Sequence, residues 1–202
     1  MEVLRPNENN LQRLGEILSS YIGTKVSSSL SMLLGESVTH KVRRIMELDS
    51  ANLESLIPVF DIIPMCSVYM KGEGDIHLAL LFSLPSSMAK QFAAKLLGIK
   101  KIVKLSSLEK SSLSEAGNML AGSFFNALSD GTGFKIDLSV PGFAIDTFKT
   151  LLEPPTLEIS KLSDSVIVAD AELHSLESNL KVHILILLSP SEAKKLLEAS
   201  VT

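Results

Sequence analysis

The chain has 202 residues, of which 46% are hydrophobic and 21% are charged, and its formal net charge is −4. This composition is too apolar for a disordered chain, and the length suits one sizeable domain or two small repeats. The negative charge argues against the basic surface that is typical of nucleic-acid-binding proteins. With a single cysteine, Cys66, the chain forms no internal disulfide.

No segment of the sequence indicates a membrane or a metal. The longest apolar runs, residues 78–82 and 184–188, are far shorter than the roughly 20 residues that span a bilayer. Residues 1–10 lack the basic-then-apolar pattern of a secretory signal. The four histidines show no metal-ligand spacing, and His77 and His183 are expected on the solvent side of strands. We therefore expect a cytoplasmic protein with no metal of its own, no membrane insertion and no nucleic-acid partner.

Apolar periodicity predicts the elements of the first half. Leucine, isoleucine and valine recur at helical spacing from Leu11 to Val26, and the helix is expected to continue to Leu34 before Gly35 stops it. Alternation of apolar and charged residues predicts a strand over residues 40–48. The other expected elements are a short helix over residues 50–56, strands over 63–70 and 75–84 joined by a turn at 71–74, and a helix over 86–97 that ends at Gly98.

The second half is expected to repeat this plan after a basic linker, residues 99–105. Its first element is a helix over residues 111–130. A strand over 134–140 and an extended stretch over 142–148 follow. Glu153-Pro154-Pro155 is expected to interrupt the extended chain, and strands over 165–173 and 180–188 come next. Ser189 and Glu192 form the pattern of a capping box that opens a closing helix.

The two halves resemble each other in sequence. HLALLFSLPSSMAKQFAAKLL from His77 is similar to HILILLSPSEAKKLLEA from His183, at an offset of just over one hundred residues. This similarity predicts an internal duplication in an α+β fold with pseudo-two-fold symmetry. Two helix–strands–hairpin–helix units, about 9–98 and 107–200, would share one sheet within a single domain over residues 1–202. Their leading helices would lie on one face.

The helix over residues 111–130, SSLSEAGNMLAGSFFNALSD, has two distinct faces. The spacing assigns five apolar positions to the core, namely Leu113, Ala116, Leu120, Phe124 and Ala127. A separate stripe, roughly 80° wide and here called the polar stripe, consists of Ser111, Glu115, Asn118, Gly122 and Asn126. Because a glycine inside a helix costs about 0.5–1 kcal/mol relative to alanine, Gly122 indicates that something approaches the backbone closely there.

The polar stripe carries a resemblance to a known family. Three residues separate Ser111 from Glu115, two separate Glu115 from Asn118, and twenty-two separate Asn118 from Pro141. This spacing reproduces the signature of the CheC, CheX and FliY phosphatases of bacterial chemotaxis. The flanking sequences EAGN, AGSFFNAL and DLSVPG also resemble CheC. Four positions at fixed long spacing are much more specific than one short motif, and the duplicated layout extends the resemblance over most of the chain.

The resemblance implies a hydrolase that removes phosphate from the aspartyl phosphate of CheY, a receiver protein of two-component signalling. In such an enzyme, Asn118 would hold the attacking water and Glu115 would form an ion pair with the lysine of the receiver's active site. Gly122 would leave room for the receiver's loops, and Ser111 and Asn126 would complete the substrate-binding surface. No cofactor of its own is implied, because the receiver holds the Mg²⁺. Pro141 is expected to shape the strand beside the helix.

The first half departs from the signature. The same spacing gives Asn9, Arg13, Glu16 and Thr39 where the family shows Ser or Asp, Glu, Asn and Pro. Arg13 would repel the receiver's lysine, and Glu16 would place a negative charge near the phosphoryl group. We expect these two side chains to form a surface ion pair instead. Many CheC proteins carry two sites, whereas this sequence indicates one intact and one degenerate site.

Two hypotheses therefore remain open. In the first, the protein is a phosphatase of a CheY-type receiver that works through Glu115 and Asn118. In the second, it is a non-catalytic adaptor that binds a receiver or the deamidase CheD, which is a partner known for the CheC family. The intact stripe favours the first hypothesis, and the degenerate first site leaves the second open. The lysines of residues 100–110 are most simply a solvated linker and helix start, and they could attract an acidic partner.

Overall fold

The computed structural model describes residues 8–49 and 63–200. Its centre is a seven-stranded sheet in which every pair of neighbours is antiparallel. The strands are β1 (Val38–Asp49), β2 (Met65–Gly74), β3 (Leu78–Pro85), β4 (Ile136–Leu138), β5 (Gly142–Asp146), β6 (Ser165–Ser175) and β7 (Lys181–Leu188). Their order is β1-β6-β7-β3-β2-β4, and β5 also pairs with β2.

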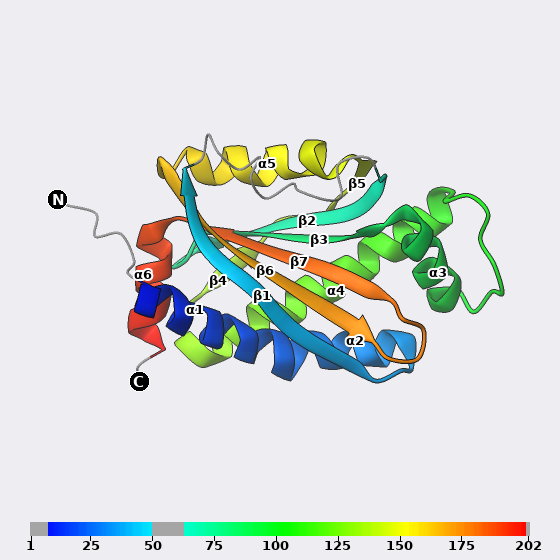
Figure 1. Cartoon of the computed structure of the whole chain (residues 1–202), viewed down its shortest axis with the longest axis horizontal. Helices are drawn as coiled ribbons and strands as arrows, with labels where there is room; N and C mark the ends of the chain where they lie inside the picture. The colour runs from blue at the N-terminus through cyan, green and yellow to red at the C-terminus, as the bar shows by residue number, and fades with distance from the viewer. Residues whose placement is uncertain (1–7, 50–62, 201–202) are drawn as a thin grey trace.

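Helices cover both faces of the sheet (Figure 1). They are α1 (Glu8–Tyr21), the π-helical turn η1 (Ile22–Val26), α2 (Ser27–Leu34), α3 (Ser86–Leu96), α4 (Ser107–Thr132), α5 (Phe148–Ser160) and α6 (Pro190–Ala199). One face carries α1, η1, α2 and α4, with α3 and α6 at opposite ends, and the other face carries α5. The α+β fold expected from the sequence is confirmed, and the structure adds that its sheet is antiparallel.

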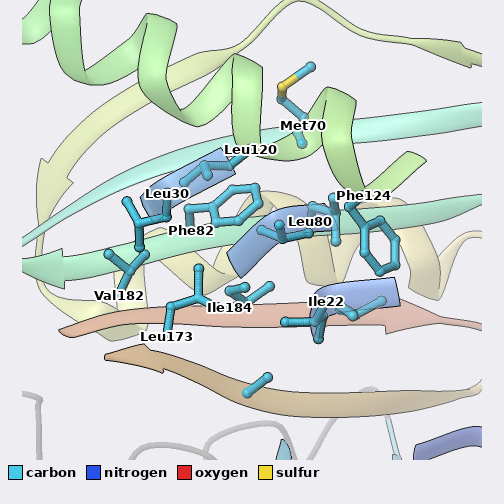
Figure 2. Packing of buried hydrophobic residues seen from close by; sticks show 14 of the residues in the cluster. Ile22, Leu30, Met70, Leu80, Phe82, Leu120, Phe124, Leu173, Val182 and Ile184 are labelled. Carbon is cyan, nitrogen blue, oxygen red and sulfur yellow. The ribbon is translucent and has the colours of Figure 1, made fainter. Parts of the chain in front are cut away.

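Two apolar clusters, one on each side of the sheet, form the core. Alternate residues of β3 and β7 point to opposite faces, so that Leu80 and Ile184 join the helices of one face while Leu81 and Leu185 contact the α5 side. Figure 2 shows Leu80 and Ile184 in the larger cluster, to which Phe124 of α4 also belongs. Because both faces of these central strands are covered, their sequences are nearly continuous apolar runs.

Most of the elements predicted from periodicity are confirmed. The long first helix reaches Leu34 and ends at Gly35, which has a φ of 65°, although the turn η1 divides it into α1 and α2. The strands expected over 40–48, 165–173 and 180–188 are β1, β6 and β7. The helix expected over residues 50–56 lies outside the described residues. No helix in the described ranges is long and apolar enough to cross a membrane.

The turn predicted at residues 71–74 is wrong. These residues continue β2, because Gly72 and Gly74 pair with Leu138 and Ile136 of β4. The chain turns instead at residues 75–77. Gly72 is needed for packing, since a Cβ there would lie 2.3 Å from the Phe125 ring. The glycine therefore marks a close approach of α4 to the sheet rather than a hairpin turn.

The expected interruption by Pro154 and Pro155 is also wrong, because both residues lie inside helix α5. Neither proline has an N–H to donate to the carbonyl four residues earlier, so each removes a helical hydrogen bond. Burial of Leu151, Leu152 and Ile159 in the α5-side cluster keeps the segment helical in spite of this loss. Tertiary packing overrides the local signal here.

Two smaller expectations need correction near the second hairpin. Ser189 Oγ accepts the Glu192 N–H at 3.3 Å, which is one half of a capping box. The Glu192 carboxylate, however, accepts from the His77 N–H at 3.1 Å and from Lys195 Nζ, so it ties α6 to the first hairpin. His183, expected on the solvent side, is buried, and desolvation lowers its pKa.

Each strand of the first half has a counterpart in the second half. When counterparts are exchanged, the strand order is the same from either edge of the sheet. In this exchange β1 corresponds to β4 with β5, β2 to β6 and β3 to β7, with the β3–β7 pair at the centre. Helix α4 packs against η1 and α2 of the first half. The internal duplication itself stays a prediction, for which superposition of the two halves is the test.

Candidate functional site

Helix α4 carries the polar stripe and is longer than the sequence predicted. It begins with a capping box in which the Glu109 carboxylate accepts the Ser106 N–H at 2.7 Å, and it ends at Gly133, which has a φ of 76°. The hydrogen bonds from Ser106 lower the pKa of Glu109. The five apolar positions predicted to face the core are all buried, namely Leu113, Ala116, Leu120, Phe124 and Ala127. The buried face fixes which side of α4 looks outward.

The polar stripe lies on that outward side. Ser111, Glu115 and Asn126 are exposed, while Asn118 and Gly122 are half-buried. Glu115 and Asn118 are one helical turn apart, or about 4.5 Å along the axis. Within the described ranges, no residue forms a hydrogen bond or ion pair with the side chain of either one. The structure thus places the five predicted residues on one outward side of α4, with a carboxylate and a carboxamide one turn apart.

Two of the three glycines of α4, Gly117 and Gly122, lie in different surroundings. A Cβ at Gly117 would come within 2.6 Å of the Val68 side chain on β2, so this glycine lets the helix approach the sheet. A Cβ at Gly122 would meet nothing within 4 Å. No packing inside the described protein therefore requires a glycine at position 122. The surroundings of Gly122 leave room for an external partner to approach the helix backbone there.

A hydrogen bond joins α4 to α2 at the edge of the stripe. Ser123 Oγ lies 2.6 Å from Ser29 Oγ of α2 and also donates to the Met119 carbonyl at 2.8 Å. This contact lies beside Gly122, on the flank of the stripe. It joins the helix that carries the predicted site to the leading helix of the first half.

Pro141 lies between β4 and β5, where pairing with β2 changes register. β4 pairs with the end of β2, and β5 pairs with its beginning. Next to the proline, Ser139 Oγ accepts the Lys71 N–H at 3.0 Å. A residue without an N–H suits this break in an edge strand. That Pro141 shapes this edge of the sheet stays a prediction.

The degenerate positions lie on α1 and β1. Asn9, Arg13 and Glu16 are all exposed on α1. The expected ion pair between Arg13 and Glu16 is not formed; Glu16 Oε1 instead accepts from Gln12 Nε2 at 3.3 Å, and Arg13 forms no salt bridge within the described ranges. A spacing of four residues along the helix favours the Gln12 contact. Thr39 donates from Oγ1 to the His174 carbonyl at 3.3 Å, across the β1–β6 pair.

An open groove of about 810 Å³ runs between α1–η1 and β1, beside Glu16. Its strand side carries Arg43 and Arg44, which form ion pairs with Glu172 at 3.6 Å and Asp170 at 3.1 Å. Ser19 Oγ lies 3.3 Å from His40 Nε2 within the groove. Neighbouring carboxylates therefore balance the charges of the two arginines in the groove.

Two exposed apolar residues beside the stripe were not predicted as part of the site. Leu108 and Met119 are 62% and 46% exposed. They are eleven residues apart, about three helical turns, so both project on the side of Glu115. The helical spacing of Leu108 and Met119 from Glu115 was the signal in the sequence that could have identified them as neighbours of the stripe. They give the polar stripe an apolar margin.

Comparison with known proteins agrees with this geometry. Residues 108–145 match the model of the CheC-like family, and this segment contains the helix from Ser111 and extends past Pro141. CheY-P phosphatase CheC of Bacillus subtilis (strain 168) is 29% identical over 185 residues, which cover 86% of this chain and 85% of that protein. The resemblance to CheC-like proteins expected from the sequence is confirmed.

Solved structures share the fold at lower identity. FliY from Thermotoga maritima superposes with a TM-score of 0.75 at 21% identity, and the match covers 97% of this chain and 98% of that one. A chain of the CheX–CheY–BeF₃–Mg²⁺ complex from Borrelia burgdorferi gives a TM-score of 0.55 at 16% identity, over 86% and 97% of the two chains. These two likenesses concern the fold alone.

Proposed function

We propose that this CheC-like chain dephosphorylates the aspartyl phosphate of a CheY-type receiver in the cytoplasm by positioning an attacking water. The observation that carries the proposal is the open polar stripe of α4, in which Glu115 and Asn118 stand one turn apart without partners in the described ranges. Its support from outside the chain is the 29% identity to a CheY-P phosphatase. Dephosphorylation of CheY-P, the reaction for which that relative is named, is the hydrolysis that we assign to this chain.

Asn118 would position the water. An aspartyl phosphate is already an activated acyl phosphate, so a helper protein has mainly to hold a water in line with the phosphorus. A carboxamide can both accept from and donate to that water, and it adds no charge beside the phosphoryl oxygens. The half-buried position of Asn118 limits the side chain's freedom and so favours a defined water position.

Glu115 would bind the receiver. In the arrangement that the resemblance implies, its carboxylate meets the lysine of the receiver's active site, while the receiver supplies the Mg²⁺. Exposure of Glu115 leaves it accessible for such a pair. Ser111 and Asn126 would extend the contact along α4, and the open space above Gly122 would admit the receiver's phosphorylation loops.

We also infer that the chain is one domain made of two related units, about 9–98 with the degenerate site and 107–200 with the intact one. The strand order, which reads alike from both edges, supports this inference. On this view the helix from Asn9 through Arg13 and Glu16 descends from a second site and no longer acts on a phosphoryl group.

The departure at Arg13 and Glu16 keeps a second function under consideration. A CheC-like chain with one site could act as an adaptor that binds a receiver or CheD without useful turnover. The two functions differ in one measurement, because an adaptor binds the phosphorylated receiver and leaves its lifetime unchanged. The intact stripe on α4 favours the phosphatase.

The test is phosphate release from phosphorylated CheY of Bacillus subtilis, the organism of the curated relative. Wild-type protein should accelerate the release, and Asn118→Ala should lower the acceleration by about a hundredfold, since misplacing a reactant costs on that order. Asn9→Ala, which removes an exposed carboxamide from α1, is the matched control and should keep the wild-type rate. Full activity of the Asn118→Ala protein would overturn the proposed mechanism.

A further inference from the structure

The region at the start of α4 is basic, although the chain as a whole is acidic. Residues 86–114 contain six lysines and a single acidic residue, Glu109, while the whole chain carries a formal net charge of −4. These residues comprise α3, the connection that follows it and the first turns of α4, at one end of the molecule (Figure 1). The positive charge is therefore concentrated beside Ser111, where the polar stripe begins.

Five of these lysines have no acidic partner among the described residues. We call them the lysine cluster, and its members are Lys90, Lys100, Lys101, Lys104 and Lys110. Within the described ranges none of them forms a salt bridge, whereas the sixth lysine, Lys95, pairs with Glu36. Unbalanced charges at this density produce a positive potential that extends into the solvent.

The fold brings these lysines together from separate segments. A depression of about 420 Å³ between α3 and the following connection is lined by Lys90, Lys100 and Lys101. Lys104 follows in the same connection, and Lys110 lies on α4, which packs against α3. The segments that carry the five lysines therefore gather at one end of the molecule.

Exposed apolar side chains accompany the lysines. Ile99 and Val103 of the connection are 46% and 78% exposed, and Leu108 and Met119 stand on the side of Glu115 on α4. Apolar contacts bordered by charged groups are typical of protein–protein interfaces, in which the apolar groups supply contact area and the charges speed the encounter. Leu108 lies at the start of α4, between the connection and the polar stripe, whereas Lys110 projects about 140° away from Glu115 around the helix axis.

We propose that Lys100, Lys101 and Lys104 of the lysine cluster, together with Ile99, Val103, Leu108 and Met119, form a docking surface for the acidic rim around the phosphorylation pocket of the receiver. The inference rests on the proposed function, because it places the receiver's phosphate over Asn118. Such a pocket is acidic for a chemical reason: carboxylates hold its Mg²⁺, and a phosphoryl group carries a charge near −2. The lysines and this rim are complementary in charge.

The cluster acts on binding and not on the chemical step. Lys110 precedes Asn118 by eight residues, which is about 12 Å along the helix, and the members of the connection lie earlier in the chain. At 0.15 M salt the Debye length is about 8 Å, so the lysines influence an approaching protein surface more than the phosphorus itself. Their loss should therefore lower the association rate and the affinity while kcat is retained.

The experiment compares two triple variants that remove the same charge. The loop variant is Lys100→Gln, Lys101→Gln, Lys104→Gln, and the matched control is Lys25→Gln, Lys161→Gln, Lys194→Gln. All six lysines are exposed, and the control lysines lie on η1, after α5 and on α6. The probe is Bacillus subtilis CheY loaded with BeF₃⁻ and Mg²⁺, whose binding to each full-length protein is measured at 50 mM and 500 mM NaCl. Phosphate release by each protein is measured in parallel.

At 50 mM NaCl the loop variant should bind this receiver about five- to tenfold more weakly than wild type, through a slower association rate, while the control stays within about twofold. At 500 mM NaCl the three proteins should bind alike, because salt screens the charges. A loop variant that binds as tightly as the control at 50 mM overturns the inference, and so does a wild type that does not bind. Weakened binding by the loop variant without any phosphate release would uphold the docking surface and overturn the phosphatase.

Discussion

Gly117 of α4 lies directly against Val68 of β2, so closely that a methyl group at position 117 would come within 2.6 Å of the valine side chain. The contact sets how deeply the helix lies on the sheet. Five residues later, Gly122 faces open space. The same residue type therefore serves packing at one position and accessibility at the other.

This difference predicts opposite effects for the same substitution. Gly117→Ala should lower the free energy of unfolding by about 1–3 kcal/mol, because the added methyl group overpacks the contact with Val68. Gly122→Ala should raise it by about 0.5–1 kcal/mol through higher helix propensity. Urea unfolding followed by circular dichroism measures both changes. If a receiver approaches the backbone at Gly122, the stabilised Gly122→Ala protein should also bind BeF₃⁻-loaded CheY more weakly, and unchanged binding would contradict the assigned close approach.

Removal of the Glu115 carboxylate should weaken receiver binding without loss of stability. Glu115 is exposed and has no partner in the described ranges, so Glu115→Ala leaves no buried group unsatisfied. Loss of an ion pair to the receiver's lysine should raise the Kd for BeF₃⁻-loaded CheY by about five- to tenfold. Asp130→Ala removes an exposed carboxylate from the same helix outside the polar stripe and serves as the control. Equal binding by these two variants would contradict the role of Glu115.

The degenerate positions of α1 should contribute nothing to the rate. The double variant Arg13→Ala, Glu16→Ala should release phosphate from CheY at nearly the wild-type rate, because neither side chain suits the receiver's lysine or the attacking water. Arg13→Glu with Glu16→Asn restores the signature and should raise the rate or leave it unchanged, since a carboxylate at position 16 repels the phosphoryl oxygens. A double-alanine variant that loses as much activity as Asn118→Ala would show that the first helix takes part.

A cluster around Glu36 predicts the acid sensitivity of the fold. Its carboxylate accepts hydrogen bonds from Lys95, Ser175 and Ser178, so it joins the end of α2 to α3 and to the β6–β7 turn. The hydrogen bond from Lys95, followed by those from the two serines, lowers the pKa of Glu36 to about 2. Because the unfolded carboxyl group has a pKa near 4.5, this stabilisation is complete above about pH 4.5 and is lost as the pH falls toward 2.

Glu36→Gln should accordingly lower the free energy of unfolding by about 1–3 kcal/mol at pH 7, as expected for loss of hydrogen bonds to a charged group. The difference between wild type and this variant should shrink as the pH is lowered from 5 to 2. Glu198→Gln, whose carboxylate is exposed and only 3.9 Å from Lys194, is the control and should change stability little at either pH. A constant difference between wild type and Glu36→Gln over this range would contradict the lowered pKa.

Local patterns determined much of the secondary structure. Helical spacing from Leu113 to Ala127 fixed the buried face of α4, and hence the outward direction of Glu115 and Asn118, because the angle between residues of a helix is constant. Period-two alternation located β1, and apolar runs located β6 and β7. Gly35 ends its helix in the left-handed conformation that a glycine adopts without strain.

Only the tertiary structure decided features whose cause lies far away in the chain. Pro154 and Pro155 sit inside a helix because the sheet buries its apolar side, and Gly72 extends a strand because Phe125 packs above it. The sequence contains each of these residues, but it does not show which distant residues pack against them.

The same division applies to the predicted site. Spacing along one helix was enough to group Glu115 with Asn118, since the site lies on a single element. The gathering of lysines from α3 and from the following connection at the start of α4, by contrast, required α3 to pack beside α4. The open space at Gly122 likewise depends on what the rest of the fold leaves uncovered, and packing between distant segments alone determines that.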